Sequence, residues 1–321
     1  MEAQAKQYRL VFMGTPFFAV RILEQLAQWP HGEIVAVYTQ PDRPAKRGKK
    51  LTASPVKEAA KAFGFSVLQP PNFRDQASVD QLAELKPDFL VVAAYGQILP
   101  AQVLALPVFP PLNVHASLLP QYRGAAPVQR AIMENYGPCA QTGVSIMQMV
   151  EALDAGPVYL QKALAIGDKT SDELLAAIAD IGGKALLEVL CAFLEGKAQA
   201  TPQDDSAASY APKIEKAAGC VNWDAPFDQV HAQIRAVTSV PGARTKLTMD
   251  DARVFEIILL PGHRGAMCQG IASGTVLFDE EGLAIACRDN WYRIDQLKPL
   301  GKAFMSSQSF ANGYLRTKKC S

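Results

Sequence analysis

The chain lacks the cysteine and histidine spacings that build disulfide frameworks and metal sites. Its six cysteines form no Cys-x-x-Cys pair, and its four histidines are scattered far apart along 321 residues. A chain of this length does not need covalent staples, so the cysteines are predicted to be reduced thiols. We expect no structural or catalytic metal.

Long hydrophobic runs are also missing. The first eight residues are polar, and the apolar run at residues 10–13 is far too short for a signal sequence or a membrane span. The start is also unlike the Arg- and Ser-rich amphipathic segment of a mitochondrial transit peptide. We therefore expect a cytoplasmic protein that binds no membrane. We also expect it to be a monomer.

Two further features are absent: a large excess of charge of one sign and a dinucleotide-binding fingerprint. Lys and Arg number 32 against 31 Asp and Glu. The turn Gly14-Thr15-Pro16 carries one glycine and no Gly-x-Gly-x-x-Gly motif. A nicotinamide oxidoreductase is therefore the weaker interpretation of an α/β chain.

The chain does have a regular alternation of short apolar runs and helical patterns up to about residue 200. Apolar runs at 10–13, 34–39 and 89–94 and a helical pattern at 17–29 predict a parallel sheet with crossover helices. A small, polar stretch between residues 195 and 212 has the composition of a linker. The hydrophobic content of 49% is enough for two cores.

Beyond this stretch, one helical pattern at 227–237 precedes several short strand-like runs. They lie at residues 245–249, 253–260, 274–278, 283–287 and 291–297. Short strands at such spacing predict a small OB-like β-barrel. The predicted fold is therefore α/β, with a Rossmann-like parallel-sheet domain at 1–206 and an OB-like β-barrel domain at 207–321.

The segment from Leu112 to Pro127 places an amide and an imidazole two residues apart at a predicted strand end. Side chains alternate along a strand, so Asn113 and His115 point to the same face. An amide donor beside a histidine suits stabilisation of a carbonyl oxygen as it becomes tetrahedral, which is the chemistry of acyl transfer. The alternative is that Asn113 caps the turn and His115 is a core histidine.

A carboxylate follows the next predicted buried strand, at residues 142–149. Asp154 lies in the loop after that strand, where Gly156 and Pro157 favour a turn. Such an aspartate can bond an imidazole and select its tautomer. The alternative is an Asx turn in which Asp154 bonds its own backbone.

These motifs resemble those of the folate-dependent formyltransferases. The resemblance rests on Asn113, His115, the Ser117-Leu118-Leu119-Pro120 run and Asp154-Ala155-Gly156-Pro157. It extends from residue 9 to residue 302, through Thr39-Gln40-Pro41-Asp42, and so covers nearly the whole chain. One departure is Val150, where the family usually carries an acidic residue, and it bears on a supporting contact alone.

The resemblance implies a catalytic triad of Asn113, His115 and Asp154, with 10-formyltetrahydrofolate as the formyl donor. Residues 95–98 follow a buried strand and enter a Gly- and Pro-bounded loop, where an apolar wall and free backbone groups suit a flat heterocycle. An ordinary strand exit with a packing tyrosine is the alternative. The implied folate contacts are Tyr95, Gly96, Gln97, Ile98, Ser117, Leu118, Leu119 and Pro120.

A loop after residue 41 concentrates five basic residues with prolines and a glycine. Mobile positive charge beside an active-site edge suits a phosphate backbone, although a solvated surface loop is an equal alternative from composition. The loop resembles that of family members that formylate methionyl-tRNA, with Arg47 matching the functional arginine. The implied tRNA contacts are Arg43, Lys46, Arg47, Lys49, Lys50, Lys298 and Lys302.

The resemblance thus implies initiator methionyl-tRNA as the acceptor. Two rival interpretations remain open from the residues. One is a formyltransferase for a small amine, such as an amino sugar nucleotide or a purine precursor. The other is a non-enzymatic nucleic-acid-binding protein in which the barrel does the work.

Overall fold

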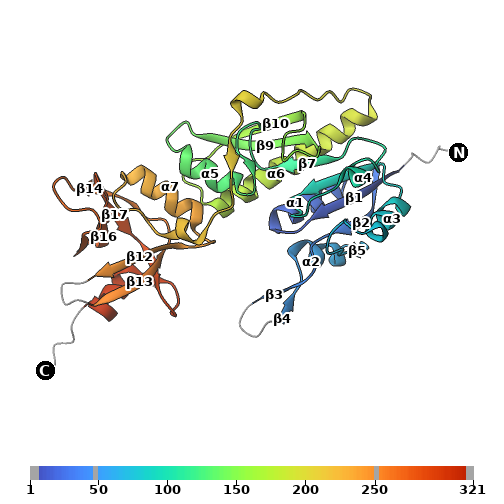
Figure 1. Cartoon of the computed structure of the whole chain (residues 1–321). Coiled ribbons are helices and arrows are strands. Elements are labelled where there is room, and N and C mark those ends of the chain that lie inside the picture. Colours follow the sequence, from blue (N-terminus) through green and yellow to red (C-terminus); the bar gives the residue numbers. More distant parts are fainter. Residues whose placement is uncertain (1–6, 46–49, 249–252, 316–321) are drawn as a thin grey trace. The chain divides into compact units, whose positions relative to one another are not determined.

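The computed structural model describes residues 7–45, 50–248 and 253–315. The chain divides into two compact units (Figure 1). The first unit comprises Met1–Pro127, Thr142–Leu164 and Leu175–Ala211, and the second comprises Val128–Gln141, Ala165–Leu174 and Pro212–Ser321. Among the described residues, no helix is both long and apolar enough to span a bilayer.

The first unit is built on a seven-stranded sheet with the order β10-β9-β7-β6-β1-β2-β5. Strands β1, β2, β5, β6 and β7 run parallel, whereas β9 pairs antiparallel with β7. The strands are β1 (Tyr8–Gly14), β2 (Gly32–Tyr38), β5 (Val67–Leu68), β6 (Phe89–Ala93), β7 (Leu112–His115), β9 (Gln141–Gln148) and β10 (Val158–Ala165).

The central strands are nearly continuous apolar runs because helices cover both faces of the sheet. All five residues of β6 are buried, as are the last five of β1. The helices are α1 (Phe17–Leu26), α2 (Pro55–Ala62), α3 (Gln76–Glu84), α4 (Ala101–Leu104) and α6 (Ser171–Leu194), whereas α5 (Pro127–Glu134) falls almost wholly in the second unit. Figure 1 shows α1 next to α6, which an ion pair between Arg21 and Asp180 joins (3.1 Å), and α3 next to α4.

A glycine lets the long helix α6 approach the sheet closely. A Cβ built on Gly182 would lie 3.1 Å from Val114 and 3.2 Å from Val144. Val114 therefore faces α6, and its neighbours Asn113 and His115 face the opposite side of β7. Close packing of α6 thus fixes which face of β7 carries the polar residues.

Two short β-pairs complete the first unit. β3 (Arg43–Ala45) pairs antiparallel with β4 (Lys50–Thr52) in a ribbon that leaves the sheet after β2. β8 (Arg123–Gly124) pairs with β11 (Tyr210–Ala211), which follows the short 3₁₀ helix η1 (Asp205–Ala207). The small, polar segment before residue 212 is therefore bonded to the loop that follows β7.

The second unit contains α7 (Phe227–Val237), a 3₁₀ helix η2 (Lys216–Gly219) and two four-stranded antiparallel sheets. One sheet has the order β12-β13-β18-β19 and the other β14-β17-β16-β15. Its strands are β12 (Ala243–Thr248), β13 (Val254–Leu259), β14 (His263–Met267), β15 (Val276–Asp279), β16 (Gly282–Ala286), β17 (Asn290–Ile294), β18 (Gln296–Pro299) and β19 (Met305–Ser306). It ends with α8 (Ser307–Phe310) and the π-helical turn η3 (Ala311–Leu315).

The predicted fold class is confirmed: a parallel-strand α/β unit precedes a small unit of antiparallel strands. The helix predicted at 227–237 has the bounds of α7. The prediction omitted β14, in which no residue is buried, so it carries little apolar signal. The run predicted at 291–297 is divided between β17 and β18, which belong to different sheets.

Candidate active site

The site lies at the edge of the sheet where the parallel strands end. Gly14 pairs with Ala93 at the ends of β1 and β6, and β7 ends one strand further along, at His115. Asn113 pairs with Val92, so the two residues share a face of the sheet. Ligands of open α/β sheets bind outside this carboxyl edge, which is where Asn113 and His115 are brought together.

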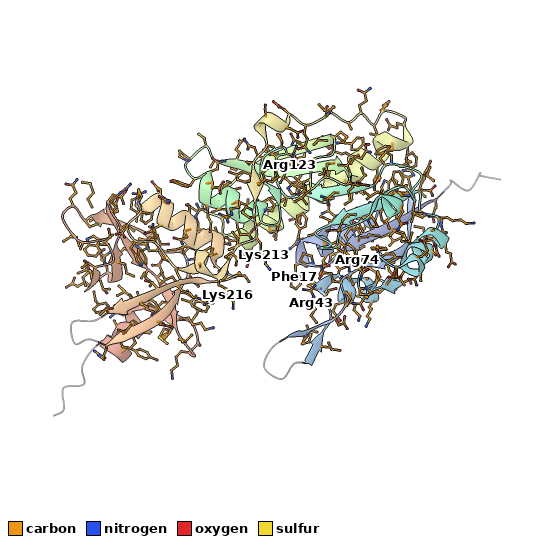
Figure 2. The ribbon with its side chains drawn as sticks, viewed as in Figure 1. Phe17, Arg43, Arg74, Arg123, Lys213 and Lys216 are labelled. Carbon is orange, nitrogen blue, oxygen red and sulfur yellow. The ribbon has the colours of Figure 1, made fainter. Side chains whose placement is uncertain are left out.

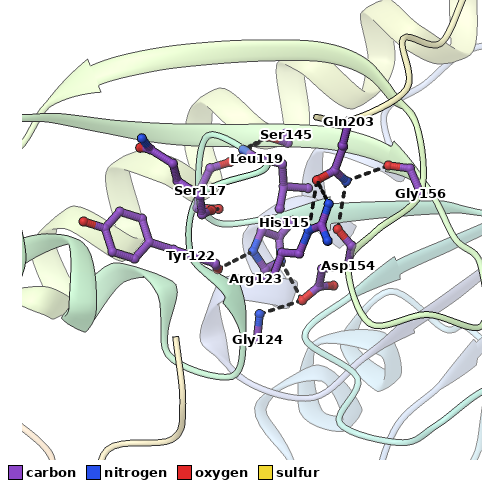
Figure 3. A network of polar contacts seen from close by, with 11 residues as sticks. His115, Ser117, Leu119, Tyr122, Arg123, Gly124, Ser145, Asp154, Gly156 and Gln203 are labelled. Carbon is purple, nitrogen blue, oxygen red and sulfur yellow. Dashed lines mark hydrogen bonds and ion pairs between the residues drawn. The ribbon is translucent and has the colours of Figure 1, made fainter. Parts of the chain in front are cut away.

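His115 is buried and contacts two acceptors. Its Nε2 lies 3.1 Å from the carbonyl oxygen of Tyr122, and its Nδ1 lies 3.7 Å from Oδ2 of Asp154 (Figure 3). Because a carbonyl can only accept, Nε2 carries the proton of the neutral ring and Nδ1 has the lone pair. A second proton would enter on Nδ1, beside the Asp154 carboxylate.

Asp154 also accepts a hydrogen bond from the backbone N–H of Gly124, 2.8 Å from the same Oδ2. Its carboxylate therefore bonds a neighbouring loop, which argues against the Asx-turn alternative. The side chains of His115 and Asp154 are 7% and 13% exposed. The structure thus brings together two groups that are 39 residues apart in the sequence.

The Asn113 amide completes the polar face of β7. Among the described residues, no side-chain hydrogen bond engages it. Its two N–H donors are therefore available to a bound molecule, beside an imidazole that can donate or accept a proton. Such a set can stabilise an oxyanion and move a proton, the two requirements of acyl transfer.

The Ser117–Pro120 run is held by Ser145, a buried residue of β9 that sequence reasoning did not single out. Ser145 Oγ donates to the Ser117 carbonyl (2.7 Å) and accepts from the Leu119 N–H (3.0 Å) and from Gln161 Nε2 (2.8 Å). The hydroxyl therefore uses its donor and both lone pairs. These bonds fix the backbone of the run next to His115. Leu119 and Pro120 border a cavity of about 380 Å³.

Residues 95–98 lie at the same edge, but Tyr95 is buried there. The residue is 2% exposed in a core cluster with Tyr38 and Phe73, and burial raises the pKa of its hydroxyl. The carbonyl of Tyr95 accepts from Thr15 Oγ1 (2.9 Å) and Gln40 Nε2 (2.9 Å). A ligand contact by Tyr95 would therefore involve its backbone.

The other residues of this loop differ in exposure. Gly96 has a φ of +78°, and a Cβ at this position would lie 2.3 Å from Gln40 Nε2. Gln97 Nε2 donates to the Pro70 carbonyl (2.9 Å), whereas Ile98 is 91% exposed. Ile98 therefore offers an apolar surface beside the strand edge.

The ribbon that carries the basic loop is anchored at its base. Asp42 accepts from Gln69 and Lys57, and these hydrogen bonds hold the pKa of its carboxyl below its usual value. Arg43 donates to Gln40 Oε1 and is labelled at the start of the ribbon in Figure 2. Lys50 begins β4. The predicted contacts Lys46, Arg47 and Lys49 lie outside the described residues.

The remaining predicted cations belong to the second unit. Lys298 lies on β18 with its Nζ 5.5 Å from the centre of the Phe304 ring, and Lys302 is exposed. Two exposed lysines that the sequence analysis did not select, Lys213 and Lys216, lie near the start of the segment Pro212–Ser321 of this unit and are labelled in Figure 2. In the described parts of both units, no group of three His, Cys, Asp or Glu side chains could hold a metal ion.

Two side chains near the site carried no usable sequence signal. Gln203 and Arg123 are joined by hydrogen bonds of 3.1 and 2.9 Å from the guanidinium to Oε1, and Gln203 also contacts the Asp154 loop (Figure 3). Gln203 lies in the segment that composition marked as a linker. Its partners are distant in sequence, so no local pattern identifies it.

Comparison with known proteins agrees with this geometry. A formyl transferase family model matches residues 8–190, and a formyl transferase C-terminal domain model matches residues 213–315. A protein of Desulfovibrio desulfuricans named methionyl-tRNA formyltransferase is 47% identical over 319 residues, which cover 98% of this chain and 95% of that protein.

Solved structures share the fold at low sequence identity. HypX from Aquifex aeolicus in complex with tetrahydrofolic acid matches with a TM-score of 0.62 and 19% identity, covering 97% of this chain and 48% of that one. An N-formyltransferase from Helicobacter canadensis, in complex with folinic acid and dTDP-3-aminofucose, matches with a TM-score of 0.61 and 17% identity. This match covers 90% of this chain and 98% of that one.

Proposed function

The chain belongs to the formyl transferase family, and from this membership we propose that it transfers a formyl group from 10-formyltetrahydrofolate to the amino group of initiator methionyl-tRNA. The observation that carries the proposal is the approach of His115 Nδ1 to Asp154 Oδ2, at 3.7 Å, on the face of β7 that also carries Asn113. This polar group fits formyl transfer, and the full-length likeness to a methionyl-tRNA formyltransferase supports the acceptor. The reaction would take place in the cytoplasm.

The reaction begins with attack of the neutral amine on the formyl carbon. A carbon–nitrogen bond forms, and the carbonyl electron pair moves to the formyl oxygen. The Asn113 amide would donate hydrogen bonds to that oxyanion, and the positive charge of a protonated His115 ring would stabilise it electrostatically. An α-amino group titrates near pH 8, so a useful fraction is neutral at physiological pH.

The second half of the reaction breaks the bond between the formyl carbon and N10 of the folate. The new ammonium must lose a proton, and N10 must gain one. Nδ1 of His115, facing Asp154, is suited to relay this proton, while the Tyr122 carbonyl keeps the ring in a fixed orientation. Products are N-formylmethionyl-tRNA and tetrahydrofolate.

We propose that the folate binds along the strand edge, between the loop of residues 95–98 and the Ser117–Pro120 run. HypX, which shares the fold, was solved with tetrahydrofolic acid. The exposed Ile98 and the rigid Ser117–Pro120 backbone offer an apolar surface and fixed polar groups, which a flat heterocycle requires.

For the tRNA, we propose contacts by the basic ribbon of the first unit, including Arg43 and Arg47, and by Lys298 and Lys302 of the second unit. An ion pair between Asp42 and Lys57 (2.7 Å) anchors the base of the ribbon next to Arg43, which supports the proposal. Phosphate contacts by Lys and Arg provide affinity and orientation.

The decisive experiment incubates purified protein with 10-formyltetrahydrofolate and either initiator or elongator methionyl-tRNA. N-formylmethionine on the initiator species alone is the expected result. A parallel reaction with an amino sugar nucleotide tests the small-amine alternative. Formylation of the sugar with no formylated tRNA would overturn the proposed acceptor, and tRNA binding with no turnover would favour a non-enzymatic protein.

A further inference from the structure

The backbone of Asp154 adopts a conformation that L-residues rarely hold. Its φ is +49°, in the left-handed region, where aspartate is tolerated better than most residues. Two residues later, a Cβ on Gly156 would lie 1.9 Å from the carbonyl oxygen of Gln148. The loop that carries the carboxylate therefore packs closely against the end of β9. Its backbone conformation is unfavourable, so contacts with other groups must stabilise it.

The side-chain amide of Gln203 contacts this loop on both sides of its turn. Its Nε2 donates to the carbonyl of Asp154 (2.8 Å) and to the carbonyl of Gly156 (2.7 Å) (Figure 3). One amide group thus uses both of its N–H donors on the backbone that orients the Asp154 carboxylate.

Arg123 fixes the orientation of that amide. Its Nε and Nη2 donate to Gln203 Oε1 at 3.1 and 2.9 Å, and Nη2 also donates to Asp205 at 2.7 Å. Arg123 is 4% exposed. A flipped amide would place its NH₂ against the guanidinium and its oxygen against two carbonyls, so a single orientation is stable.

The segment that carries Gln203 also bonds the loop on the other side of His115. The backbone N–H of Tyr122 donates to Ser209 Oγ (2.9 Å), and that of Arg123 donates to the Ser209 carbonyl (2.8 Å). Tyr122 supplies the carbonyl that accepts from His115 Nε2. One short segment therefore contacts the loops that hold both members of the His115–Asp154 pair.

We propose that Gln203 is a positioning residue for formyl transfer: its two hydrogen bonds hold the Asp154 loop so that the carboxylate faces His115. This role rests on the proposed function and adds to it a residue that acts through the Asp154 loop. It predicts a loss of kcat with little change in KM, because Gln203 acts on the Asp154 loop.

The test compares two variants that remove the donors. Gln203→Leu removes the whole amide at similar volume. Gln203→Glu keeps the acceptor for Arg123 but replaces the NH₂ with an oxygen that cannot donate to the two carbonyls. Both should lower kcat about 10- to 100-fold, with KM for folate and tRNA within about threefold of wild type.

A matched control exists in the second unit. Gln233 Nε2 also donates to two backbone carbonyls, those of Ala218 (2.9 Å) and Cys220 (2.8 Å), and its Oε1 accepts from the Asn222 N–H. Gln233→Leu should lower the melting temperature comparably to Gln203→Leu and leave kcat unchanged. A shared loss of stability is thus separated from a loss of positioning.

A double-mutant cycle shows whether Gln203 acts through Asp154. In an Asp154→Asn background, Gln203→Leu should lower kcat by less than about threefold, because the group it positions is already lost. Two results would overturn the positioning role and leave the proposed function intact. One is full additivity of the Asp154 and Gln203 substitutions, and the other is a kcat for both Gln203 variants equal to that of Gln233→Leu. Absence of formylated tRNA with the wild-type protein would overturn the proposed function, and the positioning role with it.

Discussion

Substitution of Asp154 by Asn tests the electrostatic core of the proposed reaction. The amide oxygen of the new residue can still accept from the Gly124 N–H, so the loop keeps its 2.8 Å anchor. The charge opposite His115 is lost. Two unit charges 3.7 Å apart interact by about 4 kcal/mol at an effective dielectric constant of about 20.

The Coulomb value sets the scale of the expected effect. Because the side chains are only 7% and 13% exposed, solvent screens the pair weakly. Since about 1.4 kcal/mol corresponds to a factor of ten, the upper limit is about 10³-fold in kcat. We expect a decrease of about 10²- to 10³-fold, because reorganisation of the site recovers part of the loss.

The assay is single-turnover formylation of methionyl-tRNA, with thermal unfolding measured in parallel. Asp75→Asn is the matched control: Asp75 accepts from the Ser78 N–H (2.8 Å) at the start of α3, and asparagine is an equally good helix cap. Asp75→Asn should keep both rate and stability. A folded Asp154→Asn protein with a rate within threefold of wild type would refute the role of the carboxylate.

Three further outcomes are expected. Asn113→Ala should lower kcat by about 10²-fold or more with unchanged melting temperature, measured in the same assay, because it removes an oxyanion donor. Arg47→Ala should weaken tRNA use and reduce its salt dependence while folate binding, followed by fluorescence, stays constant. Burial raises the pKa of the Cys287 thiol to about 12. At pH 8 a thiol reagent should therefore label the exposed Cys139 and Cys220 first and Cys287 only after denaturation. Peptide mapping of the labelled protein measures this order.

The elements that could be predicted from the sequence are those whose signal is local. Helix α7 has buried apolar residues at Phe227, Val230, Ile234 and Val237, a spacing of three and four residues, so its period is clear in the sequence. The parallel strands β1 and β6 are continuous apolar runs bounded by turn residues. The antiparallel direction of β9 has no local signature, because a buried strand has the same composition in either direction.

The same distinction separates the parts of the site. Asn113 and His115 lie on one strand, so alternation alone places them on one face.

Gln203 lies in a stretch whose small, polar composition indicates that it forms little regular structure of its own. That indication is correct but says nothing of nonlocal bonds, and the partner of Gln203 on the guanidinium side is 80 residues away. A segment without periodicity can still be fixed by side chains, since a buried arginine such as Arg123 must find acceptors wherever the fold supplies them. In this chain one acceptor that Arg123 finds is the amide that also bonds the Asp154 loop, which is why the polar stretch before residue 212 contributes to the proposed active site.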